Sequence, residues 1–239
     1  MEINYDFNWS MLLEDPNRQW IIEGLLTTVY LSLMAWVIAL AVGIVIGAIR
    51  MTPSRTLRII GTIYVEFFRN IPFLVQLFLW FFVFPLLLPH DWMLSWNRLP
   101  HVPFLTALLG LSLFTAARVA EHIRSGISSI PKGQFDAARS SGLTQIQMYR
   151  RVIIPYAFRV MIPTIASEFL TIFKNSALTL TVGVAEITSA AKSIEAWSFR
   201  GVEAYTVASV TYMTTTATVV LFMTWLEHRL RIPGLIAKK

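Results

Sequence analysis

Residues Leu25–Ile49 form an uninterrupted apolar run that contains no charged side chain. A helix needs about 20 predominantly apolar residues to cross the hydrocarbon core of a bilayer, and this run exceeds that length. Backbone amides and carbonyls inside a bilayer must be hydrogen-bonded within the protein, so the run is expected to be helical. The sequence therefore predicts an integral membrane protein whose first transmembrane helix covers residues 25–49.

The remaining composition agrees with membrane insertion. Of the 239 residues, 55% are hydrophobic and only 14% are charged, and the mean hydropathy is +0.59. An average soluble domain carries about 25% charged residues. We predict an all-α integral membrane protein with one transmembrane domain at 20–228, whose five transmembrane helices lie at residues 25–49, 59–88, 103–120, 161–183 and 205–227. A segment at 1–19 precedes this domain, and a tail at 229–239 follows it.

Gly43 and Gly47 lie four residues apart in the first predicted span. Small residues at this spacing allow two membrane helices to approach closely. The alternative is that these glycines have no packing role and are only tolerated in the helix. The sequence alone does not decide between the two.

The distribution of lysine and arginine predicts the orientation of the spans. Residues 50–58, 121–160 and 229–239 together hold thirteen Lys and Arg, whereas the segments on the opposite side hold four. Cytoplasmic loops carry the excess of positive charge in membrane proteins. The N-terminus is therefore predicted to lie outside, and the C-terminus and the long loop at 121–160 to lie in the cytoplasm.

Several classes of function lack support in the sequence. There is no cysteine, which excludes disulfides and catalytic thiols. No GxxxxGK[ST], HExxH or GxSxG pattern occurs, so we expect no catalytic residue, no metal site and no nucleotide site of the P-loop type. The net charge of +6 is attributed to the cytoplasmic loops and not to nucleic-acid binding, because no basic stripe with interleaved aromatics is present.

The polar stretch between the third and fourth spans is predicted to form a helix, a glycine turn and a second helix. Pro131 suits a first helical position, and Gly142 suits the left-handed residue that ends a helix. Thr144 and Gln147 have the spacing of a capping box. Phe135, Ala138, Leu143 and Ile146 form an apolar strip that can press into a partner. The alternative is an ordinary cytoplasmic loop that folds on its own membrane helices.

The same stretch carries a resemblance to a known family. Asp136-Ala137-Ala138, then Gly142, then Val152-Ile153-Ile154-Pro155 resembles the EAA loop of ATP-binding-cassette importer permeases, with Asp136 in place of Glu. The flanking segments at 68–72, 124–134 and 174–176 are similar to the polar amino-acid branch, and to glutamate/aspartate-type permeases within it. The resemblance implies a coupling helix that docks on an ATPase through these residues: Gln134, Phe135, Asp136, Ala137, Ala138, Gly142 and Pro155.

The resemblance also implies partners and a location. It implies a second, homologous permease subunit in a heteromer, two cytoplasmic ATPase subunits that bind ATP and Mg, and an extracytoplasmic amino-acid-binding protein. This chain itself would carry no cofactor. It would lie in the bacterial cytoplasmic (inner) membrane as a multi-pass protein surrounded by lipid.

Ionisable residues at membrane depth are costly and point to function. The predicted substrate path contains Arg69, Arg118, Glu121, Lys174 and Asn175. By resemblance, other permeases of this branch have an aromatic residue at the position of Arg118, and a guanidinium there would suit a dicarboxylic amino acid. The alternatives are structural: Arg118 pairs with Glu121 or Glu66, and Arg69 and Lys174 reach the membrane interface.

Two other functions keep the same spans. A subunit of an ion-coupled secondary transporter or channel would not need the pattern from Asp136 to Pro155. A non-transport membrane scaffold would use the central loop for docking but would have no reason for charges at membrane depth.

Overall fold

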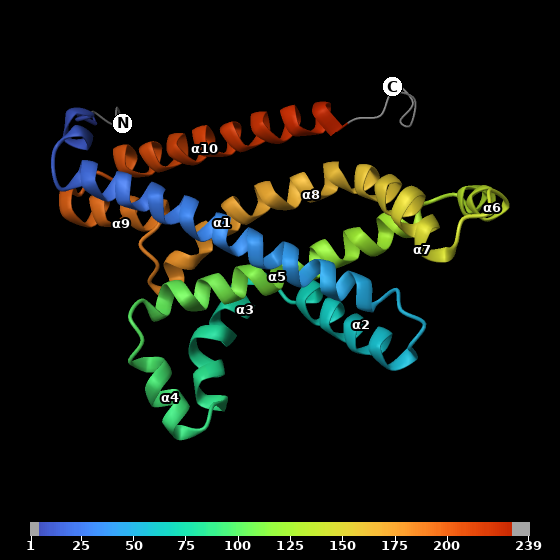
Figure 1. The fold of residues 1–239 in the computed structure, drawn as a ribbon. Coiled ribbons are helices and arrows are strands. Elements are labelled where there is room, and N and C mark those ends of the chain that lie inside the picture. The colour runs from blue at the N-terminus through green and yellow to red at the C-terminus, as the bar shows by residue number, and fades with distance from the viewer. Residues whose placement is uncertain (1–4, 231–239) are drawn as a thin grey trace. The chain divides into compact units, whose positions relative to one another are not determined.

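The computed structural model describes residues 5–230, and the regular structure in this part of the chain is entirely helical (Figure 1). The chain divides into two compact units. The first contains residues 1–35, 72–111 and 171–218, and the second contains residues 36–71, 112–170 and 219–239. The long helices contribute one part to each unit, so neither unit is a continuous piece of sequence.

Within residues 5–230, four helical segments are long and apolar enough to cross a membrane: Asn17–Ile49 (α1), Val102–Ser128 (α5), Gln145–Val182 and Gly201–Arg229, the last within α10 (Gly201–Leu230). A fifth candidate is a broken pair, α2 (Arg55–Asn70) followed by Phe73–Leu87. The pair is interrupted at Ile71 and Pro72, where Pro72 has the extended ψ of 138° that precedes a new helix. The described part of the chain therefore has the make-up of a multi-pass helical membrane protein, with four candidate spans, or five if the broken pair crosses as one.

Shorter helices lie outside the predicted spans and within the second one. These are η1 (Ser10–Leu13), α4 (His90–Asn97) and α9 (Ile187–Ser198), and the broken second span contains α3 (Phe73–Phe78), η2 (Leu79–Val83) and η3 (Phe84–Leu87). Hydropathy does not reveal such helices because they are too short to cross a bilayer.

The long helices extend beyond the predicted spans at both ends of the central stretch. α5 continues to Ser128, and the next membrane-crossing segment begins at Gln145, so most of residues 121–160 is helical. That segment contains α7 (Gln145–Met148), η4 (Tyr149–Ile153), α8 (Ile154–Ser176) and η5 (Ala177–Val182). The positions of the bilayer boundaries along these helices stay predictions, and residues 1–4 and 231–239 of the predicted terminal segments lie outside the described part.

Two π-helical turns each lead into a proline. η2 ends at Val83, two residues before Pro85, and η4 ends at Ile153, two residues before Pro155. A proline has no N–H to donate to the carbonyl four residues back, and its ring clashes with that carbonyl. A wider turn with bonds to the fifth residue accommodates the proline without ending the helical path.

The glycine pair of α1 packs closely against α5 within the second unit, which is one of the two alternatives that the sequence left open. A Cβ added to Gly43 would lie 2.6 Å from Cγ1 of Val119, and one added to Gly47 would lie 3.0 Å from Cγ2 of Ile123. These two glycines therefore set the distance between the two helices.

Each unit has its own apolar core. In the first unit the core joins η1, α9 and the start of α10 through Met11, Ile187, Ala191, Ile194, Ala204 and Ala208. In the second unit it joins the central helices and the start of α8 through Ile130, Ala138, Met148, Ile153, Ala157 and Met161.

A buried carboxylate anchors the start of α9 in the first unit. Glu186 is fully buried and caps α9 by accepting a 2.9 Å hydrogen bond from the backbone N–H of Ser189. Its other oxygen accepts a hydrogen bond from the Tyr212 hydroxyl on α10. Burial raises the pKa of the Glu186 carboxyl above its ordinary value.

Candidate functional site

The predicted coupling helix is present as α6 (Lys132–Ser140). Pro131 lies one residue before it as the N-cap, instead of at the first helical position. Gly142 has a φ of +75°, in the left-handed region as predicted. The N–H of Gly142 donates to the carbonyl of Arg139 at 2.9 Å, and the N–H of Leu143 donates to that of Ala138 at 3.3 Å. These two bonds form a Schellman motif, which closes α6 and fixes the direction of the chain after it.

The second helix of the stretch begins at the predicted capping box. The Thr144 hydroxyl accepts the N–H of Gln147 at 3.3 Å, and the Gln147 side chain accepts the N–H of Thr144 at 3.0 Å. The π turn and Pro155 then lead into α8. Helix, glycine turn and capped helix are therefore held by local hydrogen bonds that the sequence encodes.

The predicted apolar strip is divided between two environments. Ala138 is buried in the core of the second unit, and Phe135 and Leu143 pack against the same core. Ile146, in contrast, is 80% exposed. Most of the strip therefore faces the chain's own helices, which is the alternative that the sequence left open, and Ile146 alone of the four is exposed.

The outward surface of α6 consists of other residues. Gln134, Asp136 and Ala137 are exposed, and no described residue forms a hydrogen bond or ion pair with the Asp136 side chain. Asp136 lies at the centre of α6, outside its first turn. The segment therefore presents a small, mixed polar and apolar surface on a rigid support.

A second group of functional candidates centres on Glu121 of α5 in the second unit. Arg50 Nη1 lies 2.6 Å from Glu121 Oε2, Arg124 Nη2 lies 2.6 Å from Glu121 Oε1, and Arg69 Nη1 lies 3.8 Å from Glu121 Oε2. We call these four residues the Glu121 cluster. One carboxylate thus faces three guanidinium groups, and the surplus of positive charge makes this region attractive to anions.

The arginines of the Glu121 cluster differ in exposure. The side chain of Arg50 is 7% exposed, whereas those of Arg69 and Arg124 are 43% and 41% exposed. Gly61 of α2 makes room for the buried one, because a Cβ there would lie 2.7 Å from Cγ of Arg50. Arg50 is therefore the structural member of the cluster, and Arg69 and Arg124 are the accessible ones.

Arg118 pairs with a carboxylate that was not predicted as its partner. Its Nε donates to Glu168 Oε2 of α8 at 2.7 Å, and neither Glu121 nor Glu66 pairs with it. His122 Nε2 lies 3.1 Å from Glu168 Oε1. The predicted pairing with Glu121 or Glu66 is wrong, because Glu168 occupies the side of Arg118 that faces α8.

Part of Arg118 stays accessible. The guanidinium lies 5.6 Å from the centre of the Phe114 ring, its side chain is 39% exposed, and no described residue accepts a hydrogen bond from its two terminal nitrogens. Glu168 holds one edge of the guanidinium, so the terminal nitrogens form an oriented fork. A fork of this kind matches a carboxylate.

The predicted path residues do not all belong to one group. Arg69, Arg118 and Glu121 lie in the second unit, whereas Lys174 and Asn175 lie in the first. Lys174 is exposed, and its ammonium pairs with none of the described side chains. The sequence reading missed the roles of Arg50, His122 and Glu168. The spacing of Arg118 and His122, four residues apart on one helix, is the signal that could have indicated a shared partner.

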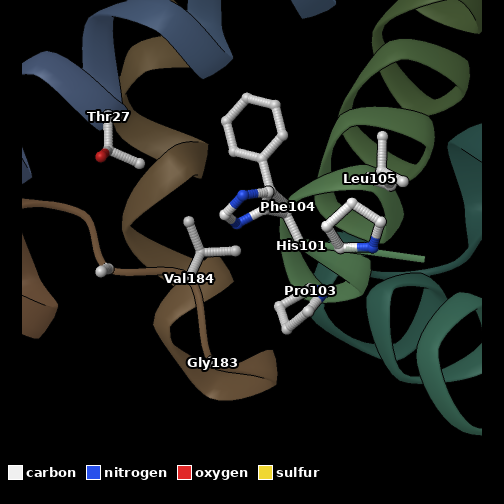
Figure 2. A pocket seen from close by; sticks show the side chains of 9 residues that line it. Thr27, His101, Pro103, Phe104, Leu105, Gly183 and Val184 are labelled. Atoms are coloured by element: carbon white, nitrogen blue, oxygen red, sulfur yellow. The ribbon is translucent and has the colours of Figure 1, made fainter. Parts of the chain in front are cut away.

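The first unit contains a cavity of about 470 Å³ (Figure 2). It is bounded by the start of α5 and by the residues after η5. Its walls are mainly apolar, and His101 and Thr27 supply its polar side chains. None of the predicted path residues lines it. In the described part of the chain, no group of three or more His, Asp or Glu is placed to hold a metal ion.

Comparison with known families gives a match over almost the whole chain. Residues 10–232 match the family described as the inner membrane component of binding-protein-dependent transport systems. The chain is 39% identical over 242 residues to the glutamate/aspartate import permease protein GltJ of Escherichia coli O6:H1, covering 97% of this chain and 98% of that protein. It is also 29% identical over 226 residues to GltK of the same strain, a second glutamate/aspartate import permease protein, with 94% and 99% covered.

A solved structure shares the fold. A crystal structure of an amino acid ABC transporter with histidines aligns with a TM-score of 0.82 and 28% sequence identity, covering 94% of this chain and 100% of that one.

Proposed function

Because the chain belongs to the family of inner membrane components of binding-protein-dependent transport systems, we propose that it is the permease subunit of an ATP-driven importer of glutamate and aspartate. The substrate assignment is supported by the similarity to GltJ and GltK. The oriented fork of Arg118 is the observation in this chain that carries it.

The proposed complex contains a second, homologous permease. Two different permeases named for the same substrates occur in one E. coli strain, and this chain is similar to both. Four or five spans provide little wall for a path, so two subunits around a two-fold axis would enclose it. The complex would lie in the bacterial inner membrane, with the N-terminus outside and the C-terminus inside.

The helix α6 would couple ATP hydrolysis to movement of the spans. Two ATPase subunits in the cytoplasm would bind ATP and Mg, and α6 would lie in a groove of one of them. Docking of a short helix in a groove transmits rigid-body motion when the helix is firmly supported. The Schellman motif and the capping box supply this support, and Gln134, Asp136, Ala137 and Ile146 supply the exposed contact surface.

Substrate recognition would use charge. A dicarboxylic amino acid brings a net negative charge, which the surplus of positive charge in the Glu121 cluster attracts. The terminal nitrogens of Arg118 would then bind one carboxylate in a bidentate manner, with Glu168 holding the guanidinium in place. Lys174 and Asn175 remain candidates for the path by resemblance alone.

ATP-driven uptake by the reconstituted complex tests the substrate assignment. Vesicles with ATP inside and the binding protein outside should take up labelled glutamate and aspartate, and Arg118→Ala should reduce uptake at least tenfold, as expected for loss of one charge-assisted pair of about 1.5–3 kcal/mol. Arg98→Ala is the matched control, because Arg98 is exposed and belongs neither to the Glu121 cluster nor to the Arg118–Glu168 pair. Undiminished uptake by the Arg118 variant would remove Arg118 from the substrate site.

Charge reversal tests the coupling role. Asp136→Lys should weaken association with the ATPase and lower transport, because a positive charge at this exposed position would repel a basic residue of the ATPase. Asp91→Lys, in the first turn of α4, is the matched reversal elsewhere. Equal ATPase association and transport in both variants would refute a pairing role for Asp136.

A further inference from the structure

His122 and Arg118 bind the two oxygens of one carboxylate in the second unit. Arg118 Nε donates to Glu168 Oε2 at 2.7 Å, and His122 Nε2 lies 3.1 Å from Glu168 Oε1. The two donors are four residues apart on α5, which places them on one face of that helix, and Glu168 belongs to α8. The proposed function uses Glu168 to orient the guanidinium of Arg118, and it leaves His122 without a role.

The three side chains differ in their access to water. The Glu168 side chain is 7% exposed, whereas those of His122 and Arg118 are 28% and 39% exposed. An ionised carboxylate only accepts hydrogen bonds, so Nε2 of His122 carries the hydrogen in this contact. No described residue forms a hydrogen bond with the other ring nitrogen, Nδ1. Water can therefore supply a proton to Nδ1 while Nε2 keeps its bond to the carboxylate.

The protonation of His122 determines the net charge of this group. With a neutral imidazole, the charges of Arg118 and Glu168 cancel. With an imidazolium, the same three side chains carry one net positive charge. Glu121 is the only other carboxylate on α5, and it is held by the guanidinium groups of its own cluster, which come from α1, α2 and α5. Glu121 therefore does not offset the charge of an imidazolium at His122.

The substrate class fits the protonated state. Glutamate and aspartate each carry one net negative charge at neutral pH, and glutamine and asparagine carry none. Opposite charges attract more strongly at the lower effective dielectric constant of a protein than in water. A positively charged group therefore binds the dicarboxylic amino acid in preference to its amide, whereas a neutral group has little basis for distinguishing them.

A purely structural role for His122 is the alternative. Its bond to Glu168 would then only connect α5 to α8. Arg118 already makes that connection to the same carboxylate, at the shorter distance of 2.7 Å. A second bond from the same helix adds little rigidity, but a histidine adds a charge that changes between about pH 5 and 8. The geometry therefore favours a role that depends on charge.

We propose that His122 is a positioning residue that sets the preference of this permease for dicarboxylic over neutral amino acids. The imidazolium shares the charge of Glu168, so that the charge of Arg118 stays available to a carboxylate of the substrate. The proposal rests on the proposed function, because it assumes that Arg118 binds the transported amino acid.

The test measures binding of labelled glutamate and glutamine by the purified complex in nanodiscs without the binding protein, so that only the selectivity of the permease is recorded. Glutamate should bind more tightly as pH falls from about 8 to about 5.5, and glutamine binding should stay constant. At about pH 6, His122→Gln should weaken glutamate binding about tenfold, the effect of one unit charge over about 12 Å at an effective dielectric constant of about 20. It should leave glutamine binding unchanged.

The pH profile separates charge from structure. His122→Gln keeps an N–H donor and should abolish the pH dependence, whereas His122→Lys should bind glutamate tightly throughout the pH range. His90→Gln, at an exposed histidine of α4, is the matched control and should behave as the unsubstituted complex.

Two results for the His122→Gln variant would overturn the proposal in favour of a structural connection. One is a loss of glutamate and glutamine affinity by the same factor, and the other is an unchanged pH profile. If that variant fails to assemble, loss of the glutamate preference in His122→Lys would overturn the proposal as well. Failure of the proposed function is distinguishable, because the unsubstituted complex would then show no preference for glutamate over glutamine at any pH.

Discussion

Replacement of Glu121 by glutamine removes the single carboxylate of the Glu121 cluster. The loss of stability depends on whether water can replace the carboxylate at each guanidinium. Arg69 and Arg124 are 43% and 41% exposed, so water can hydrate them and their ion pairs contribute little to stability. Arg50 is 7% exposed and would keep a buried, unpaired charge.

The unpaired charge of Arg50 therefore determines how far Glu121→Gln lowers the free energy of unfolding. Removing one partner of a buried ion pair destabilises a protein by about 3–5 kcal/mol. Since Glu121 itself is 18% exposed, we expect the lower end, about 3 kcal/mol. For a chain of this length that corresponds to a fall of roughly 6–12 °C in the thermal midpoint.

The assay is thermal unfolding of the detergent-purified protein, followed by tryptophan fluorescence and circular dichroism. Glu23→Gln is the control, because Glu23 is exposed and accepts a hydrogen bond from Gln19 of its own helix. The double variant Arg50→Met with Glu121→Gln should recover most of the lost stability, since the buried charge is then gone. A Glu121→Gln protein as stable as the Glu23→Gln control, or a double variant no better than Glu121→Gln alone, would refute the reasoning.

Three further predictions concern backbone and burial. Gly142→Ala should destabilise the protein by about 1 kcal/mol and reduce coupling to the ATPase, because alanine is strained at a φ of +75°. Gly133→Ala is the control, because a Cβ at this position of α6 meets open space. In thermal unfolding it should leave stability unchanged or raise it. Gly43→Val should destabilise by about 1–3 kcal/mol in denaturant titrations by forcing α1 away from Val119, and a second change of Val119 to Ala should relieve part of this loss. The raised pKa of Glu186 means that the folded state binds more protons than the unfolded state above the ordinary carboxyl pKa of 4.5, so stability should fall as pH rises from 4.5 through the raised pKa. Glu186→Gln should abolish that slope in melts recorded across about pH 4–8.

The central stretch shows what sequence reasoning can predict. Its features depend on local chemistry: Gly142 adopts the left-handed conformation, and Thr144 and Gln147 form the capping box. Both are confirmed because the physical cause lies within four residues of each position. The environment of the apolar strip depends on the chain's own tertiary packing, so Phe135 and Ala138 could not be assigned to a partner or to the core from sequence.

The ion pairs show the limit of the same reasoning. Arg118 and Glu168 are fifty residues apart, and hydropathy says nothing about which carboxylate faces which guanidinium. No sequence pattern favours Glu168 over Glu66 as the partner of Arg118. Short helices in polar connections, such as α9, were missed because only the membrane-crossing length leaves a clear signal.

Purification of the tagged chain from its native membrane in mild detergent tests the central claim most directly. Mass analysis should identify a P-loop ATPase and a second permease that co-purify in equal amounts, and Asp136→Lys should reduce the ATPase while the second permease stays. Recovery of the chain alone, or of a self-oligomer without an ATPase, would contradict the account and favour an ion-coupled transporter or channel.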